Sequence, residues 1–365
     1  MRRRLMAGLG LLAALLSFSV PVTVAAHDFD GVGTVYTMTN SAAGNAVLAY
    51  ARAADGSLSL RGTFPTGGLG TGVGLGSQGA VTLSADGRWL AAVDAGSNDV
   101  ALFAVGPKGD LRLADSVAAG GTSPISVTLH GPILYVLDAG GTGNIAGFAR
   151  IGRHLVALPG SIQPLSGAGT SPEQIAFSPD GGVLVVTEKG AGEIVTYRVG
   201  FFGIAGPPSV SASAGAAPYG FAFDGRGRLF VSEAAGSALS SYSVSPGGVP
   251  SVISASIANG LQAACWVTLT PDGRYAFTID AHSPARISSY AIAADGSLTL
   301  VNATAGGSST APLLDASVNG DGRFLYVVDV GAGAIDSFRI GSGGSLTPTG
   351  STPGLPAGSG GLAAS

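Results

Sequence analysis

The sequence predicts an all-β protein in which seven four-stranded blades form a ring, a seven-bladed β-propeller. One unit recurs along the chain: a short apolar strand, a tight turn, and a second apolar strand that ends in an acidic or amide residue. Successive units start 45 to 49 residues apart, a period typical of propeller blades. The 60 glycines are more than a helical protein tolerates, and they suit a chain with many tight turns.

The strands of each blade can be placed from this repeat. Second strands are near-continuous apolar runs, such as residues 184–187 and 325–328, which is expected of strands packed between neighbouring blades. Asp-Gly pairs, a strong signal for a tight turn, join first to second strands at Asp180 and Asp272 and third to fourth strands at Asp295. The first strands are expected to begin near Gly79, Pro124, Pro172, Pro218, Ala264, Leu313 and Ser359.

The two ends of the chain each supply part of one blade. The segment near Thr34 resembles a second strand with no first strand before it, and residues 359–365 resemble a first strand with nothing after it. We therefore expect the C-terminal strand to pair beside residues 35–39. This pairing would close the ring and remove an open sheet edge.

The N-terminus has the pattern of a secretory signal peptide. Three arginines precede an apolar run over residues 5–20, and small residues stand before a cleavage site after Ala26. The sequence predicts a signal peptide at 1–26 and a single propeller domain at 27–365, which would be secreted or periplasmic. No later stretch has the length and apolar character of a membrane span, so none is expected after cleavage.

Composition narrows the classes of partner. The formal net charge is −4 and 11% of residues are charged, which gives no electrostatic reason to expect nucleic acid or an anionic membrane as partner. Cys265 is the sole cysteine, so no intrachain disulfide can form. We expect a monomer that takes a small-molecule substrate or ligand and uses no cofactor.

Three segments of the repeat stand out: Ser178-Pro179-Asp180-Gly181, Thr270-Pro271-Asp272-Gly273-Arg274-Tyr275 and Val35-Tyr36-Thr37-Met38-Thr39-Asn40. They resemble the seven-bladed lactonase family, which includes proteins similar to 6-phosphogluconolactonase and to carboxymuconate cyclase, and the third is similar to the Tyr-Val-Thr-Asn repeats of surface-layer and lactonase propellers. The resemblance covers nearly all of residues 27–365 and implies the propeller fold and a lactonase-type hydrolase.

The resemblance does not extend to the family's histidines. Members have a His-rich motif at the start of one first strand, whereas this chain has no Pro-His-x-His run. Its four histidines are His27, His130, His154 and His282. No catalytic histidine is carried over, so candidate site residues must come from the pattern of this chain itself.

Each blade places an acid or an amide at the end of its second strand. One interpretation is a ring of oxygen ligands for Ca²⁺ or a similar hard cation. The other is that each side chain caps a nearby turn. Presence in all seven blades favours the structural interpretation, so we assign no metal site. These residues are Asn40, Asp94, Asp138, Glu188, Glu233, Asp280 and Asp329.

Residues that break the repeat are better candidates for function. Glu173 and Gln174 start the first strand of blade four, where other blades have apolar or small residues, and Glu188 and Lys189 end its second strand. Two carboxylates beside an amine would supply an acid and a base with separated pKa values. The alternative is a solvated ion pair of little energetic weight. We predict Glu173, Glu188 and Lys189 as catalytic residues.

The next three blades also start their first strands with unusual residues. Tyr219 and Trp266 would stack on a ligand, and Asp315 would accept its hydrogen bonds. Alternatively, the two aromatic side chains plug the channel between the blades. The predicted substrate-binding residues are Gln174, Tyr219, Glu233, Trp266, His282 and Asp315.

Two functions remain open at this point. The first is an exported lactonase-like hydrolase that acts on a small lactone or related cyclic metabolite at the central opening. The second is a non-catalytic propeller that binds a protein, a glycan or another cell-envelope partner. Propellers host many functions, so the fold alone does not choose between them.

Overall fold

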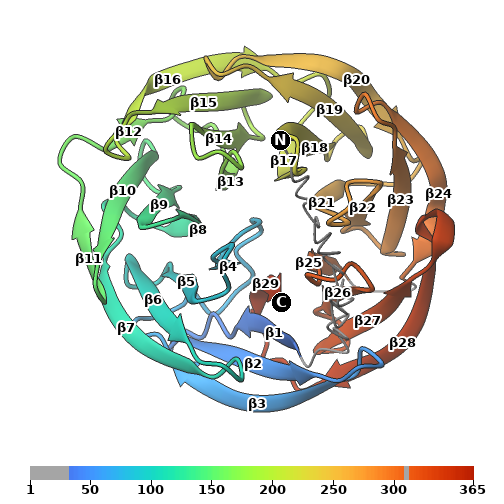
Figure 1. The fold of residues 1–365 in the computed structure, drawn as a ribbon, viewed down its shortest axis with the longest axis horizontal. Coiled ribbons are helices and arrows are strands. Elements are labelled where there is room, and N and C mark those ends of the chain that lie inside the picture. Colours follow the sequence, from blue (N-terminus) through green and yellow to red (C-terminus); the bar gives the residue numbers. More distant parts are fainter. Residues whose placement is uncertain (1–32, 308–311) are drawn as a thin grey trace, which may run out of the picture. The chain divides into compact units, whose positions relative to one another are not determined.

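The computed structural model describes residues 33–307 and 312–365, so the predicted signal peptide at 1–26 lies outside the described residues. Seven antiparallel sheets stand around a central channel (Figure 1). The propeller prediction is thereby confirmed, and the first strands begin within about two residues of the predicted positions. No helix among the described residues is long and apolar enough to cross a membrane.

The first three blades are built as follows. Blade one contains β29 (Gly360–Ala364), β1 (Gly33–Met38), β2 (Ala46–Arg52) and β3 (Leu58–Pro65). Blade two contains β4 (Val81–Leu83), β5 (Trp89–Asp94), β6 (Asp99–Val105) and β7 (Leu111–Ala118). Blade three contains β8 (Pro124–His130), β9 (Ile133–Asp138), β10 (Asn144–Ile151) and β11 (His154–Ala157), and β12 (Gln163–Pro164) also pairs with β10.

The other four blades follow the same order from the channel outward. Blade four contains β13 (Pro172–Phe177), β14 (Val183–Glu188), β15 (Glu193–Val199) and β16 (Ala205–Ala212). Blade five contains β17 (Pro218–Phe223), β18 (Arg228–Glu233), β19 (Ala238–Val244) and β20 (Pro250–Ala258). Blade six contains β21 (Ala264–Leu269), β22 (Tyr275–Asp280), β23 (Arg286–Ile292) and β24 (Leu298–Gly306). Blade seven contains β25 (Leu313–Val318), β26 (Phe324–Asp329), β27 (Ala334–Ile340), the 3₁₀ turn η1 (Ser342–Gly344) and β28 (Leu346–Pro353).

The ring closes through the two chain ends, as the sequence predicts. β29 pairs antiparallel with β1, and Ala363 lies opposite Tyr36. The backbone amide of Gly361 in β29 also donates a hydrogen bond to Asp315 of blade seven, at 2.8 Å. The C-terminal strand therefore completes blade one and holds it against blade seven, so that β1 has no unpaired edge toward the channel.

Burial explains why the inner strands read as continuous apolar runs. Every residue of β14 and of β26 is buried, because both faces of these strands pack on neighbouring blades. The outermost strands instead combine buried or half-buried positions with exposed ones, as in β16. The hydrophobic core is accordingly a set of clusters between blades rather than one central mass.

Tyrosines in the second strands of blades one, three and seven link each of these blades to the next. The hydroxyl of Tyr36 donates to the carbonyl of Gly109 at 3.0 Å, and Tyr135 donates to Gly203 at 2.9 Å. Both glycines have a positive φ, and a Cβ added at Gly109 would lie 1.9 Å from the side chain of Thr34. Glycine is thus required at this turn both by its backbone conformation and by the close approach of the neighbouring blade.

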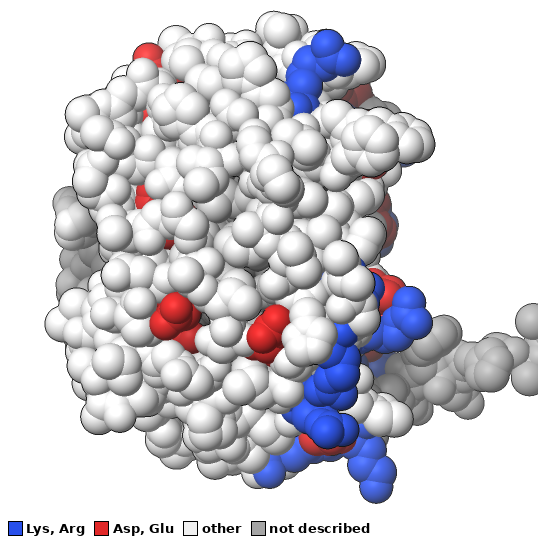
Figure 2. Space-filling view, turned by 90° about the vertical axis from the view of Figure 1, so that its left-hand side faces the viewer, with Lys and Arg blue, Asp and Glu red and all other residues white. Residues whose placement is uncertain are grey.

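The propeller has two distinct faces. The turns from first to second strand and from third to fourth strand lie on one face, which we call the turn face, because consecutive strands run antiparallel. The opposite face, which we call the pocket face, carries the remaining connections. Every Lys and Arg of the described residues lies in a turn of the turn face or within four residues of one, except Lys189 and Arg286. In Figure 2 the Lys and Arg side chains accordingly gather along one edge of the propeller.

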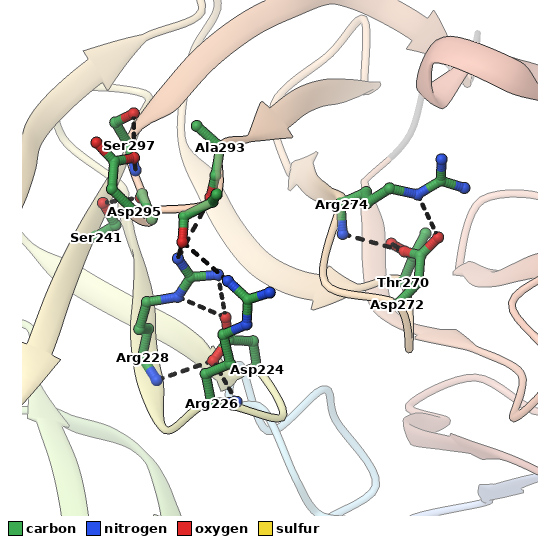
Figure 3. Close-up of polar contacts among 12 residues, drawn as sticks. Asp224, Arg226, Arg228, Ser241, Thr270, Asp272, Arg274, Ala293, Asp295 and Ser297 are labelled. Atoms are coloured by element: carbon green, nitrogen blue, oxygen red, sulfur yellow. Dashed lines mark hydrogen bonds and ion pairs between the residues drawn. The ribbon is translucent and has the colours of Figure 1, made fainter.

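Some of these arginines hold neighbouring blades together. In the Asp-Gly-type turn of blade five, Arg228 is bonded to Asp224 and its Nη1 donates to the carbonyl of Ala294 in blade six, at 2.9 Å (Figure 3). Arg226 donates to the same carbonyl, also at 2.9 Å. Arg274 in blade six instead pairs with Asp272 of its own turn. The turn face is therefore a charged surface built on a rigid network of turns.

Candidate functional site

A pocket of about 500 Å³ opens on the pocket face between blades three and four. Its walls come from the starts of β8 and β13, the turn between β9 and β10, and the residue that follows β14. Leu75 and Gly76, which precede β4, form the wall nearest the channel. The lining residues are Leu75, Gly76, Ser123, Ile125, Ala139, Gly141, Thr142, Gly143, Leu165, Gly169, Thr170, Ser171, Pro172, Glu173, Lys189 and Tyr219.

Glu173 faces this pocket because a β-bulge interrupts the first strand. Pro172 pairs with Glu188 and Gln174 pairs with Thr187, so Glu173 is the extra residue between them. A bulge leaves such a residue out of the ladder and redirects its side chain. Blades three, five and six have the same irregularity at the start of their first strands, around Ile125, Tyr219 and Cys265. The repeat thus supplies the geometry, and the residue type at the bulge distinguishes blade four.

Glu173 forms an ion pair with Lys189 at the floor of the pocket. Oε1 of Glu173 contacts Nζ of Lys189, and the Glu173 side chain is 6% exposed whereas that of Lys189 is 38% exposed. Nζ of Lys189 also lies 5.0 Å from the ring centre of Tyr219, which is a cation–π contact. The ammonium group is therefore held by two partners while remaining accessible from the pocket.

Burial sets the electrostatics of this pair. Desolvation raises the pKa of Glu173 to about 7, although its contacts with Lys189 and Tyr219 act in the opposite direction. Burial also raises the pKa of Tyr219, and the nearby negative charge of Glu173 adds to this effect. A carboxylate whose pKa lies near neutrality can exchange a proton at neutral pH, which is what a general base requires.

The other catalytic candidate of blade four, Glu188, lies outside the pocket. Its carboxylate accepts hydrogen bonds from the backbone amide and the hydroxyl of Ser166, in the connection that leaves blade three. Glu188 is fully buried and is absent from the pocket lining. The structure therefore brings Glu173 and Lys189 together and separates Glu188 from them.

Three of the predicted substrate-binding residues are engaged in contacts within the fold. The amide of Gln174 forms two hydrogen bonds with the backbone of Phe221, of 3.0 and 2.6 Å. Nε1 of Trp266 donates to the carbonyl of Ser77 at 3.0 Å. Asp315 accepts a hydrogen bond from Gly361. The functional groups of these side chains thus join blades to one another, and their burial leaves little room for a ligand.

Tyr219, Glu233 and His282 occupy three different environments. Tyr219 lines the pocket, packs edge-on against Trp266 with ring centres 5.3 Å apart, and donates its hydroxyl proton to the carbonyl of Gly76. Glu233 is buried and accepts a hydrogen bond from Ser213 at 2.8 Å. His282 is exposed in the connection between β22 and β23 and does not line the pocket.

The acids that end the second strands bond mainly to the connection leaving the preceding blade. Asp94 of blade two accepts from Thr66 at 2.7 Å, and Asp280 of blade six accepts from Asn259 at 3.0 Å. Glu188 and Glu233 do the same with Ser166 and Ser213, whereas Asp329 accepts from the amide of Ala332 in its own turn. Within the described ranges, no three His, Cys, Asp or Glu side chains converge as metal ligands.

The residues that sequence reasoning missed belong to the long connection between blades one and two. Residues 76–79, which we call the channel segment, cross toward blades three to six before β4 begins. The carbonyl of Gln78 accepts from Ser126 of blade three at 2.7 Å, and its amide donates to the carbonyl of Glu173 at 3.1 Å. The available signal was the length of the Gly-rich run at residues 67–79, which exceeds what a connection between adjacent blades needs.

Part of the propeller matches a known protein family. Residues 232–360 match the family model described as lactonase, 7-bladed beta-propeller. The chain has the lactonase-type seven-bladed propeller fold. This confirms the resemblance that the repeated segments indicated. The matched part of the lactonase-type propeller runs from the end of β18 to the start of β29, so the pocket in blades three and four lies outside it.

Several solved structures share the fold at low sequence identity. A candidate 6-phosphogluconolactonase from Bacteroides uniformis aligns with a TM-score of 0.73 at 17% identity, covering 92% of this chain and 100% of that one. A similar candidate from Bacteroides fragilis has a TM-score of 0.69 at 18% identity, covering 92% and 99%. The periplasmic gluconolactonase of Pseudomonas aeruginosa has a TM-score of 0.73 at 17% identity, covering 91% and 99%. No curated protein matches the chain.

Proposed function

We propose that this chain is an exported lactonase-like hydrolase that opens a small, uncharged lactone in the pocket between blades three and four. The observation that carries the proposal is the Glu173–Lys189 ion pair at the floor of that pocket. The lactonase-type fold and the structural similarity to a periplasmic gluconolactonase support the reaction class and the export. The N-terminal signal pattern supports the export independently.

The two residues would divide the work of ester hydrolysis. The ionised Glu173 accepts a proton from a water molecule as the water oxygen bonds to the lactone carbonyl carbon. The ammonium group of Lys189 stabilises the negative charge that develops on the carbonyl oxygen. When the ring C–O bond breaks, the departing alkoxide takes the proton back from Glu173, so that the product is a hydroxy acid and the carboxylate is regenerated.

A panel of lactones assayed with wild type and two variants tests the proposal. Glu173→Gln keeps the shape of the side chain but cannot accept the proton, and we expect it to lower kcat by about 100-fold or more. Lys189→Ala should lower kcat to a similar extent. Glu193→Gln, a half-exposed carboxylate of the same blade outside the pocket, serves as the matched control and should keep wild-type rates. No turnover by wild type, or equal turnover by all four proteins, would rule the proposal out.

A second candidate function is ligand binding without catalysis. It is favoured by one observation: the channel segment is hydrogen-bonded to Trp266 and Val267 at the central opening, where propeller ligands commonly sit. In that case the pocket would hold a small molecule through the Lys189 ammonium group. Saturable binding of a lactone without hydrolysis, abolished by Lys189→Ala, would distinguish this function from the first.

A further inference from the structure

Three neighbouring blades expose large apolar side chains at the tips of their third-to-fourth-strand turns. Ile151 of blade three is 64% exposed, Phe201 and Phe202 of blade four are 98% and 75% exposed, and Val249 of blade five is 52% exposed. We call these four residues the apolar rim. The equivalent turns of blades one and six carry Asp-Gly-Ser instead. The rim therefore covers one side of the turn face only, and it is not a consequence of the repeat.

The two phenylalanines are held in water by a well-defined turn. Their rings contact each other edge-on, with centres 5.3 Å apart. The turn that carries them closes through hydrogen bonds between Gly200 and Ile204 and between Gly203 and Gly200, each of 2.9 Å. The hydroxyl of Tyr135 fixes the carbonyl of Gly203 from the neighbouring blade. A rigid turn that presents two adjacent phenyl rings to solvent is costly in water and typical of an interaction site.

The rim is surrounded by positive charge. Arg150 and Arg153 flank Ile151, Arg198 precedes the phenylalanine turn, and Arg226 lies in the adjacent turn of blade five. Arg226 hydrogen-bonds to a backbone carbonyl rather than to a carboxylate. The turns of blades four and five carry two acids: Asp224 is bonded to Arg228, and Asp180 accepts hydrogen bonds from the hydroxyl of Ser178 and the amide of Gly182. This part of the turn face therefore combines exposed apolar tips with an excess of arginine.

We infer that the turn face docks on an anionic lipid bilayer through the apolar rim. The phenyl, isoleucine and valine tips enter the headgroup region, and the arginines contact lipid phosphates. A bilayer suits the rim because its four side chains stand on three separate turns, and lipids rearrange around spaced tips whereas a folded partner needs a matching surface. Docking in this way leaves the pocket face, with Glu173 and Lys189, turned toward water. The net charge of −4 hides this local excess of cations.

Vesicle co-sedimentation of the mature protein tests the inference. We expect binding to vesicles of phosphatidylglycerol mixed with phosphatidylcholine, weaker binding at high salt, and little binding to pure phosphatidylcholine. Phe201→Ser/Phe202→Ser should weaken binding at least tenfold, and so should Arg153→Gln/Arg198→Gln. All four side chains are at the surface, so unchanged thermal unfolding would show that the variants fold. Matched controls on the pocket face are Val73→Ser, which changes an exposed apolar residue, and Arg286→Gln.

Two further measurements keep the inference falsifiable. Phe201→Trp should show a blue shift of fluorescence on anionic vesicles, because the new indole would leave water. No sedimentation with anionic vesicles, or equal loss of binding in the pocket-face controls, would overturn the inference. Binding to a soluble sulfated polymer with no binding to vesicles would also overturn it, because that result would assign the arginines to a polyanion rather than to lipid.

Discussion

The side-chain amide of Gln78 forms hydrogen bonds in both directions with the backbone of Val267, across the central channel. Its Nε2 donates to the carbonyl of Val267 at 2.9 Å, and its Oε1 accepts from the amide of Val267 at 3.0 Å. The amide of Gln174 makes the same arrangement with Phe221. The two glutamine side chains thus pair with a strand as the backbone of a neighbouring strand would. They supply hydrogen-bond partners for backbone amides and carbonyls at the inner edges of blades five and six.

Replacing Gln78 should therefore destabilise the fold. Gln78→Ala leaves the amide and carbonyl of Val267 without partners at a site with little access to water, which typically costs about 1–3 kcal/mol. We expect a lower melting temperature and a lower free energy of unfolding in denaturant titration. Gln262→Ala, at an exposed position of the loop before β21, is the matched control. Equal stability of the two variants would contradict a structural role for the channel segment.

Closure of the ring by β29 makes a second prediction. Deleting residues 359–365 exposes the edge of β1 and removes the partner of Asp315, so the melting temperature should fall sharply. Ser365→Ala removes only the terminal hydroxyl contact with Thr34 and should have a small effect. An unchanged unfolding transition in the deletion variant would show that ring closure contributes little.

Buried acids make stability depend on pH. Desolvation raises the pKa of Asp138 to about 7 and those of Asp94 and Asp280 to about 6, against about 3.9 in an unfolded chain. Between these values the folded chain binds more protons than the unfolded chain, so the free energy of unfolding decreases as pH rises. We expect the melting temperature to fall from about pH 5 to about pH 8.

Variants identify the groups responsible for this slope. Asp138→Asn is uncharged at every pH, and one carboxylate oxygen of Asp138 is buried without a partner, so the variant should flatten the slope and raise stability at high pH. Asp110→Asn, on an exposed turn, serves as control. Turn-face acids act in the opposite sense, because hydrogen bonds from Ser84 and Arg88 lower the pKa of Asp86 to about 2. The stability that such acids contribute to the folded chain is lost only as the pH falls below about 4.

The proposed chemistry has its own pH dependence. Because the pKa of Glu173 is raised to about 7, kcat/KM for a neutral lactone should rise with pH through that region and then level off. Removing the neighbouring ammonium group with Lys189→Ala takes away a contact that lowers this pKa, so the inflection should move to higher pH. Lys189→Arg keeps a positive charge and should leave the inflection nearer its original position. If the inflection of the pH profile stays at the same pH in Lys189→Ala, Glu173 is not the general base.

The charges of the pocket predict which lactones react. Glu173 and Lys189 are the only charged residues among those that line it, and they neutralise each other. A phosphate group would find no unpaired cation there, whereas phosphate sites normally present arginine or lysine. We expect kcat/KM for an unphosphorylated sugar lactone to exceed that for its 6-phosphate at least tenfold. A preference for the phosphorylated lactone would place the reaction at another site.

Sequence reasoning reached the site in part. The break in the repeat at Glu173 and Lys189 identified two residues that meet in the pocket. The same reasoning included Gln174, Trp266 and Asp315, whose contacts within the fold depend on residues about 45 to 190 positions away in the chain. It missed the channel segment, because a Gly-rich run shows neither where it crosses the ring nor what it touches.

The seven blades, their strand order and the closure by the two chain ends could all be predicted from the sequence. These features depend on local rules, namely alternation, turn residues and a regular period, which are repeated often enough to be read without coordinates. Which side chains face the pocket, and how charge is distributed over the two faces, depend on contacts between blades and became visible in the folded chain. The antiparallel order of the strands places nearly all lysines and arginines of the described residues at one face and leaves Lys189 beside Glu173 on the other, and this sorting depends on strand direction in three dimensions rather than on composition.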